Sequence, residues 1–170
     1  MHRGADGAVV EFGCYIGTTS LFIRRLLDVY NSDKPFHVYD SFAGLPDKAV
    51  QDSSPIGADF QAGELSVSRK QFLEQFHKAR LRPPIVHKAW FNQLTAQDVP
   101  NKIAFAFLDG DFYESIIDSL RLVWPRMQPG GIITIDDAGR EALPGVDRAI
   151  RDFFQDKQQR ITVTQNIAII

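Results

Sequence analysis

The chain has 170 residues, of which 44% are hydrophobic and 24% are charged, and its formal net charge is −2. This length suits one domain with its own core, and the composition argues against a disordered or membrane-spanning protein. The charges are scattered rather than gathered in a basic stripe, so nucleic-acid binding is not expected. The N-terminus lacks the apolar core of a signal peptide and the single cysteine, Cys14, fits a reducing compartment. We therefore expect a cytoplasmic protein that does not engage membranes.

The first part of the chain alternates strand-like and helix-like segments. The short apolar run 8–12 predicts a buried strand, and 18–30 carries apolar side chains at helical spacing. A second strand is expected over 36–39 and ends at Asp40. Residues 41–62 are rich in Gly, Pro, Ser and Asp and have no period, which predicts a long loop. Long loops in compact domains are usually functional, so we predict a mobile lid that closes over a ligand.

The middle of the chain continues the alternation. A helix is expected over 68–79 and a third strand over 85–88. The almost wholly apolar run 103–108 ends at Asp109 and predicts a central strand covered on both faces. The amphipathic segment 114–124 predicts a helix that a following proline ends or kinks.

The last part contains a glycine-rich break, 129–131, ahead of another buried strand over 132–135. A proline opens a helix over 144–154, and 161–170 reads as one or two closing strands. Apolar strands that alternate with helices predict a doubly wound, mostly parallel sheet with helices on both faces. Residues 1–170 thus form a single α/β domain with the first strand at the centre of its sheet.

Four expected strands carry an acid at or just after their ends: Glu11, Asp40, Asp109 and Asp136. Any one of them alone could cap a helix or lie in a solvated loop. In open α/β sheets, ligands bind beyond the carboxyl ends of the strands. Four acids at one edge of the sheet therefore indicate a functional site.

Two glycines, Gly13 and Gly17, lie in the turn after the first strand, where the backbone can come close to a ligand. The middle glycine of the dinucleotide-binding fingerprint is absent. Asp40, at the end of the next strand, is placed to bind a ribose diol. Together these features indicate a nucleoside ligand without choosing between a nicotinamide and an S-adenosylmethionine cofactor.

Further acids gather in the second half, where Asp109 and Asp111 follow one strand and Asp136 and Asp137 follow the next. Converging carboxylates repel one another unless a cation or a shared proton is present. Oxygen ligands favour Mg²⁺, with Mn²⁺ or Ca²⁺ as alternatives, and the lack of Cys or His among them argues against zinc.

At these positions the sequence resembles the macrocin O-methyltransferase family, metal-dependent enzymes that methylate sugar hydroxyls of natural products. The matching stretches are Glu11-x-Gly13-x-Tyr15-x-Gly17, Tyr39-Asp40-Ser41-Phe42-Ala43-Gly44-Leu45-Pro46, Trp90-Phe91, Asp109-Gly110-Asp111-Phe112-Tyr113-Glu114-Ser115, Pro129-Gly130-Gly131, Asp136-Asp137 and Pro144-Gly145. The resemblance implies a class I methyltransferase fold, which is Rossmann-like and has seven strands with an antiparallel last strand. It implies S-adenosylmethionine as the methyl donor and a small, glycosylated or polyhydroxylated molecule as the acceptor.

The resemblance also assigns residues. It places Glu11, Gly13, Gly17 and Thr19 along the methionine half of the cofactor and Asp40 at the ribose. The whole set of expected cofactor contacts is Glu11, Gly13, Tyr15, Gly17, Thr18, Thr19, Asp40, Ser41, Phe42, Trp90 and Asp109. Asp109, Asp136 and Asp137 match the family's metal ligands, and Asp111 matches its general base.

The chain departs from the family at Ala89, at Ala138 and ahead of its first strand, where we expect the family's N-terminal helical segment to be absent. Two alternatives stay open beside an active O-methyltransferase, which could be a homo-oligomer. One is a non-catalytic remnant that binds S-adenosylmethionine. The other is a nicotinamide-dependent oxidoreductase, which the missing middle glycine and the lack of a Tyr-x-x-x-Lys pair disfavour.

Overall fold

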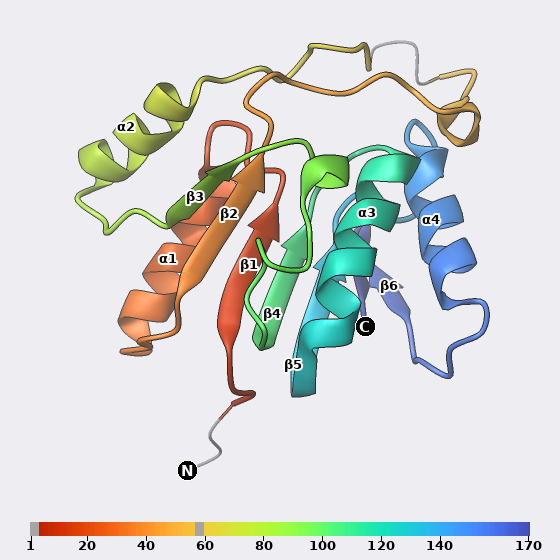
Figure 1. Ribbon diagram of the computed structural model, residues 1–170. Coiled ribbons are helices and arrows are strands. Elements are labelled where there is room, and N and C mark those ends of the chain that lie inside the picture. Colours follow the sequence, from red (N-terminus) through yellow and green to blue (C-terminus); the bar gives the residue numbers. More distant parts are fainter. Residues whose placement is uncertain (1–3, 57–59) are drawn as a thin grey trace.

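The computed structural model describes residues 4–56 and 60–170, and in these residues seven strands form one sheet (Figure 1). Their order is β3-β2-β1-β4-β5-β7-β6. The strands are β1 (Ala8–Phe12), β2 (Phe36–Asp40), β3 (Ile85–Lys88), β4 (Ile103–Leu108), β5 (Met127–Ile135), β6 (Thr162–Thr164) and β7 (Ile167–Ile169). Strands β1 to β5 pair in parallel, and β7 pairs antiparallel with β5 and with β6. The predicted mostly parallel sheet is confirmed, but β4 takes the middle position that was expected for the first strand, and β1 lies beside it.

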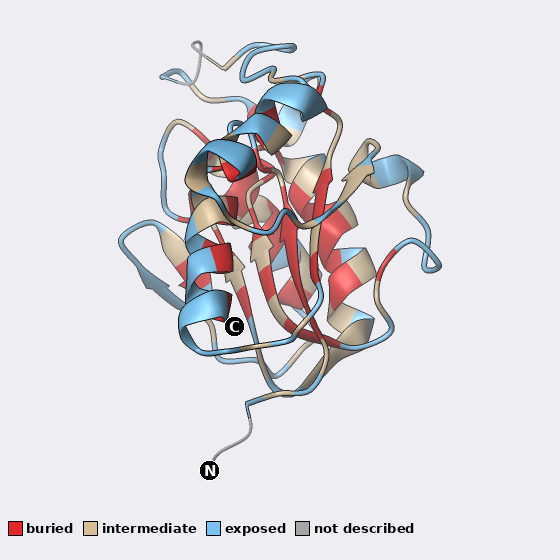
Figure 2. Cartoon of the chain, turned by 90° about the vertical axis from the view of Figure 1, so that its left-hand side faces the viewer, coloured by how far each residue is buried: buried red, intermediate tan, exposed pale blue. Residues whose placement is uncertain are grey.

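Two helical layers enclose the sheet. The helices are α1 (Thr18–Val29), α2 (Arg69–Ala79), α3 (Tyr113–Val123) and α4 (Pro144–Phe154), and short 3₁₀ turns are η1 (Val50–Asp52), η2 (Phe91–Gln93) and η3 (Trp124–Arg126). Because successive side chains of a strand point to opposite faces, Val10 of β1 packs in the core beneath α3 and α4, whereas Val9 packs beneath α1 and α2. The strands between the layers are accordingly the most buried part of the molecule (Figure 2). No helix in the described ranges is long and apolar enough to cross a bilayer.

Local sequence signals explain where several elements begin. The Ser68 side chain accepts a hydrogen bond from the Gln71 amide, and the Gln71 side chain accepts one from the Ser68 amide, which caps the start of α2. The closing hairpin turns at Gln165 and Asn166, which both have positive φ (49° and 62°), as tight β-hairpins require. Helix α4 begins at Pro144, as predicted.

The glycine-rich stretch 129–131 was predicted to break the chain ahead of a strand, but β5 already begins at Met127. Ile103 pairs with Met127 and Phe105 pairs with Ile132, so the stretch is an irregularity within the ladder. Gly130 adopts φ +78°, which lets the extra residues loop out while both flanks stay paired. The parallel ladder therefore resumes and carries β5 to the same edge as β1, β2 and β4.

Candidate functional site

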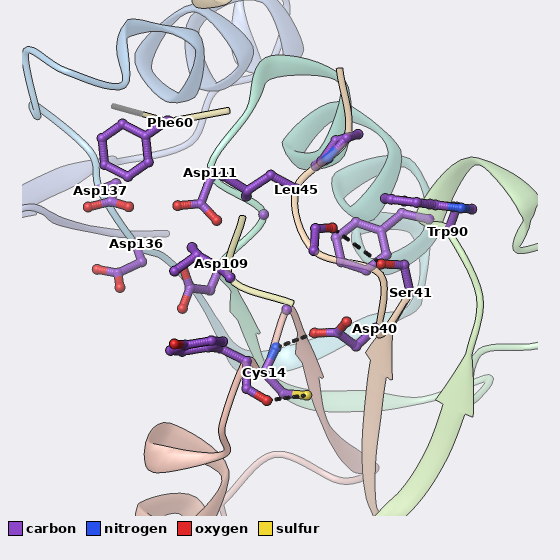
Figure 3. A pocket seen from close by; sticks show the side chains of 18 of the residues that line it. Cys14, Asp40, Ser41, Leu45, Phe60, Trp90, Asp109, Asp111, Asp136 and Asp137 are labelled. Carbon is purple, nitrogen blue, oxygen red and sulfur yellow. Dashed lines mark hydrogen bonds between the residues drawn. The ribbon is translucent and has the colours of Figure 1, made fainter. Parts of the chain in front are cut away.

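A pocket of about 370 Å³ lies at the carboxyl ends of the parallel strands, within the volume range of small-molecule sites. Its wall combines the turn after β1, the end of β2, parts of the 41–65 loop, and the turns after β4 and β5. Figure 3 shows Asp109, Asp111, Asp136 and Asp137 on one side and Asp40 with Trp90 on the other. The loop crosses over these strand ends on its way from β2 to α2 (Figure 1).

The turn after β1 needs its glycines for reasons of space and backbone conformation. Gly13 has φ +87°, and a Cβ there would lie 1.9 Å from the Asp109 carbonyl oxygen. Gly17 has φ +91°, and a Cβ there would lie 2.9 Å from the Phe72 ring. Between them Tyr15 holds φ 44°, which is uncommon for an aromatic residue, and lines the pocket. Such strained backbone is often stored at functional sites.

Asp40 joins this turn to the start of the long loop. Its Oδ2 accepts a hydrogen bond from the Cys14 amide at 2.9 Å, and its Oδ1 accepts one from the Phe42 amide at 2.7 Å. Each oxygen keeps a free lone pair, and the carboxylate faces the pocket. Asp40 can therefore hold the turn in shape and still accept hydrogen bonds from a ribose diol.

Three carboxylates form the centre of the acidic side. One oxygen each from Asp109, Asp111 and Asp137 lies within 4.8 Å of the others. Burial, followed by repulsion from neighbouring acids, raises the pKa of Asp109 well above its ordinary range and the pKa of Asp111 to about 7. Asp111 and Asp137 both have φ 59°, an uncommon left-handed backbone conformation, and both side chains line the pocket.

Asp136 differs from its expected place. It lines the same pocket beside Asp137, and burial raises its pKa. However, the group of three carboxylates within 4.8 Å contains Asp111 where Asp136 was expected. Two oxygens bound to one ion at about 2.1–2.4 Å can be about 4.2–4.8 Å apart at most. The group Asp109, Asp111 and Asp137 thus fits a hard divalent cation, and the pocket beside it fits a nucleoside cofactor.

Arg140 is a site residue that the sequence did not reveal. Its guanidinium donates to Asp137 Oδ1 at 2.7 Å and lies 5.7 Å from the centre of the Phe60 ring. It opposes the rise in the pKa of Asp111 and of Asp136. No motif marks it, because its role depends on the path of the turn after β5.

Glu11 is completely buried and accepts a hydrogen bond from Ser20 Oγ. Its other oxygen, Oε1, has no partner among the described residues. Burial raises the pKa of Glu11 to about 8, although the Ser20 bond opposes the rise. The acid lies beneath the glycine turn rather than in the pocket wall.

The pocket wall includes nine of the expected site residues: Gly13, Tyr15, Asp40, Ser41, Trp90, Asp109, Asp111, Asp136 and Asp137. In the part of the chain that the structure describes, five others lie outside that wall: Glu11, Gly17, Thr18, Thr19 and Phe42. Their contacts with a cofactor stay predictions. Additional lining residues that the sequence did not single out are Cys14, Gly44, Leu45, Pro46, Phe60, Leu65, Phe91, Gly110, Ser115 and Arg140. Several of these lie in the motifs shared with the family or in the long loop, so those two features of the sequence could have indicated them.

Known proteins with similar sequences are named as O-methyltransferases. The chain is 30% identical over 174 residues to 8-demethyl-8-(2,3-dimethoxy-alpha-L-rhamnosyl)-tetracenomycin-C 4'-O-methyltransferase of Streptomyces olivaceus, covering 98% of this chain and 64% of that protein. It is 29% identical over 162 residues to mycinamicin III 3''-O-methyltransferase of Micromonospora griseorubida, covering 90% of this chain and 62% of that protein. The chain thus spans a little under two thirds of the length of these relatives.

Solved structures show the same fold. The O-methyltransferase NovP superposes with a TM-score of 0.82 at 24% identity over 97% of this chain and 71% of that one. The calicheamicin methyltransferase CalS11 gives 0.81 at 19% identity over 97% of this chain and 72% of that one. The α/β architecture is therefore that of class I methyltransferases. The sequence model of the macrocin-O-methyltransferase (TylF) family matches residues 1–169, and the chain belongs to this family.

Proposed function

We propose that this chain transfers a methyl group from S-adenosylmethionine to a hydroxyl of a sugar or related natural product, with a divalent cation in the site. The observation that carries the proposal is one pocket with a glycine turn and Asp40 on one side and a group of buried carboxylates on the other. The first side suits a nucleoside donor and the second suits an activated hydroxyl.

The residues of β1 and β2 would bind the donor. Asp40 would accept hydrogen bonds from the ribose hydroxyls, and the glycine turn would leave backbone amides facing the methionine half. Trp90 lines the wall on the Asp40 side and would contact the adenosine. In this arrangement the sulfonium methyl would face the acidic side.

Asp109 and Asp137 would hold the cation, and Asp136, which lines the same pocket outside the tight group, would turn toward it as the third ligand. When bound, a divalent cation orients a hydroxyl and lowers its pKa. Asp111 would accept the proton that the hydroxyl loses, because its carboxylate lines the pocket beside Asp109 and Asp137. Such a step typically contributes about 10²–10⁴-fold, and fixing donor and acceptor in line contributes further.

The relatives support the class of acceptor. The two with the longest matches are named for 4'-O- and 3''-O-methylation, of a rhamnosyl tetracenomycin and of mycinamicin III. A third, of Streptomyces niveus, is named demethyldecarbamoylnovobiocin O-methyltransferase. We therefore propose a glycosylated or polyhydroxylated small molecule as acceptor.

The test combines binding and turnover. Calorimetric titration with S-adenosylmethionine and with NAD, each with and without Mg²⁺, identifies the cofactor. Mass spectrometry then detects the gain of one methyl group on a panel of glycosides and their aglycones. Binding of S-adenosylmethionine with methylation of at least one glycoside is expected. Cofactor binding without transfer to any acceptor would favour the non-catalytic alternative, and binding of NAD alone would favour the oxidoreductase.

A variant of the proposed base sharpens the test. Asp111→Asn keeps the size of the side chain but cannot accept a proton, so methyl transfer should fall by about 10²-fold or more. Affinity for S-adenosylmethionine should stay unchanged. Retained transfer in this variant would remove Asp111 from the role of base.

A further inference from the structure

The long loop after β2 is closed at its neck by two backbone hydrogen bonds. The Leu45 amide donates to the Glu64 carbonyl at 2.8 Å, and the Gly63 amide donates to the Leu45 carbonyl at 2.9 Å. The far part of the loop contains η1 and lies against the top of α4 (Figure 1). Asp52, the last residue of η1, is only 2% exposed. A carboxylate this deeply buried needs hydrogen-bond partners.

Those partners tie the loop to the start of α3. Asp52 Oδ1 accepts a hydrogen bond from the Tyr113 amide at 2.8 Å, and Oδ2 accepts one from the Ala49 amide at 2.9 Å. Tyr113 is the first residue of α3, and the preceding Phe112 provides no side-chain cap. The first amides of a helix lack partners within it, and a negative charge there is favourable. Asp52 therefore caps α3 from a segment 61 residues earlier in the chain.

Helix α4 completes the arrangement. A Cβ on Gly145 would lie 1.7 Å from Asp52 Oδ1 and 2.9 Å from the Tyr113 amide nitrogen. The glycine thus leaves the space in which the carboxylate meets the amide. Ser54 Oγ also donates to the Glu141 carbonyl at 2.9 Å, and the Arg148 guanidinium donates to the Gln51 carbonyl.

We propose that Asp52 is a positioning residue for methyl transfer, which fixes the acceptor side of the pocket. This inference rests on the proposed function. Asp111, the proposed base, lies two residues before Tyr113 in a tight turn where the Phe112 amide donates to the Gly110 carbonyl at 2.6 Å. Holding the Tyr113 amide fixes this turn and hence the direction of the Asp111 carboxylate. The same anchor holds the loop, whose residues Leu45 and Pro46 line the pocket.

The donor side should be independent of the anchor. Asp40 ends β2, and Gly13 lies in the turn after β1, which is joined to Asp40 through the Cys14 amide rather than through η1. Loss of Asp52 should therefore impair transfer to the acceptor while S-adenosylmethionine still binds normally. A merely structural role would weaken both together.

The first experiment measures the anchor without turnover, by amide hydrogen exchange on the whole chain. In Asp52→Ala the Tyr113 amide should exchange roughly 10- to 100-fold faster than in wild type, as expected for the loss of a hydrogen bond to a charged acceptor. Asp52→Asn retains one carbonyl oxygen and should show a smaller increase. Val50→Ala is the matched control, because Val50 lies on the same turn and is 88% exposed. Unchanged exchange at Tyr113 in Asp52→Ala overturns the inference, whatever the acceptor assay gives.

The second experiment measures turnover with a glycoside that wild type methylates. Asp52→Ala should lower kcat/KM for the acceptor by about 10- to 100-fold, the range that a small misplacement of reacting groups can cost. Affinity for S-adenosylmethionine should match that of wild type. Gly145→Ala in the wild-type background should lower kcat/KM by a similar factor. In the Asp52→Ala background it should lower kcat/KM less, because the Asp52 carboxylate that the new Cβ would meet is absent.

The outcomes separate the two claims. Equal losses in cofactor affinity and in transfer, or kinetics in Asp52→Ala that equal those of Val50→Ala, overturn the positioning role. If wild type methylates no acceptor, the proposed function fails, and with it the role in transfer. The exchange experiment then still decides whether Asp52 holds the loop and α3 together.

Discussion

At the scale of single residues, burial rather than net charge sets the behaviour of the acids. Asp109, Asp111 and Glu11 each have a raised pKa, and burial is the largest cause in every case. Arg140 partly offsets the charge of the cluster through its ion pair with Asp137. A site of this kind binds either protons or a cation, because ionised carboxylates repel one another, and of the two only a cation lowers the pKa of a nearby hydroxyl.

Asp40 provides the first prediction at this scale. Asp40→Ala removes the acceptor of the Cys14 and Phe42 amides together with the proposed ribose contact. Affinity for S-adenosylmethionine should fall by roughly 1–3 kcal/mol, the cost of charge-assisted hydrogen bonds. Calorimetric titration measures the effect, with the distant surface variant Asp156→Ala as control. Unchanged affinity would remove Asp40 from the donor site.

Glu11 predicts a pH dependence of stability. Because burial raises its pKa to about 8, the folded protein keeps a proton that the unfolded chain releases above its ordinary, lower pKa. An acid whose pKa is raised on folding stabilises the fold fully below its ordinary pKa. This contribution is lost as the pH rises from that value to the pKa of about 8 in the folded protein. Glu11→Gln removes the proton uptake, so its free energy of unfolding relative to wild type should rise with pH, by at most roughly 1.4 kcal/mol per pH unit.

Urea denaturation of both proteins without cofactor, at several pH values between about 5 and 8, tests this prediction. The difference between the two free energies of unfolding is the quantity of interest, since other titrating groups are shared and cancel. Parallel pH profiles would show that Glu11 is ionised in the folded protein.

At the scale of elements, the parallel strands bring the acids to one edge, while the loop after β2 shapes the pocket above them. The loop is anchored at its neck, around Leu45, and at η1, whereas the pocket-lining residue Phe60 lies between these two anchors. Lids are usually drawn from the less stable parts of a fold. The lid that the sequence predicts is therefore expected to be the part of the loop between these anchors.

Hydrogen exchange with and without S-adenosylmethionine tests that expectation. The Phe60 amide should gain protection when the cofactor binds, whereas the Leu45 amide, which already donates to the Glu64 carbonyl, and the amides of η1 should be protected in both states. The reason is that Asp52 docks η1 independently of any ligand. Strong and equal protection of the whole loop in both states would instead describe a permanently packed segment.

At the scale of the whole molecule, the proposed donor and acceptor sites occupy two sides of one pocket, with β1 and β2 serving one and β4 and β5 the other. Chelation should separate them. Excess chelator should abolish methyl transfer and leave S-adenosylmethionine affinity largely intact, because the cation serves the acceptor. Added Mg²⁺ should restore transfer. Full activity in excess chelator would contradict the proposed role of the cation.

Direct metal binding gives an independent measure. Calorimetric titration with Mn²⁺ should show a site in wild type that Asp137→Ala weakens, because Asp137 contributes an oxygen to the group that also contains Asp109. The control is Asp118→Ala, since this acid lies on α3 and pairs with Arg121 outside the pocket. Equal affinity in wild type and Asp137→Ala would place the ion elsewhere.

The sequence by itself determined the fold and the edge at which the site lies. Apolar runs such as 103–108 and helical periods such as that of 18–30 report on local environment, and parallel strands necessarily end at one edge. Asp40 and Asp109 were therefore found from their positions at strand ends. The boundaries of β5 were less accurate, because the extra residues around Gly130 bulge within a ladder that only the partner strand defines.

Tertiary structure decided which side chains meet. Asp111 joins Asp109 and Asp137 because two turns adopt left-handed backbone, and Arg140 reaches Asp137 because the turn after β5 folds back. Asp52 meets the Tyr113 amide across 61 residues, and Glu11 faces Ser20 beneath the glycine turn. Periodicity describes which face of an element a residue occupies. The direction of a side chain in a turn, and its partner from a distant loop, depend on packing between elements that no local pattern encodes.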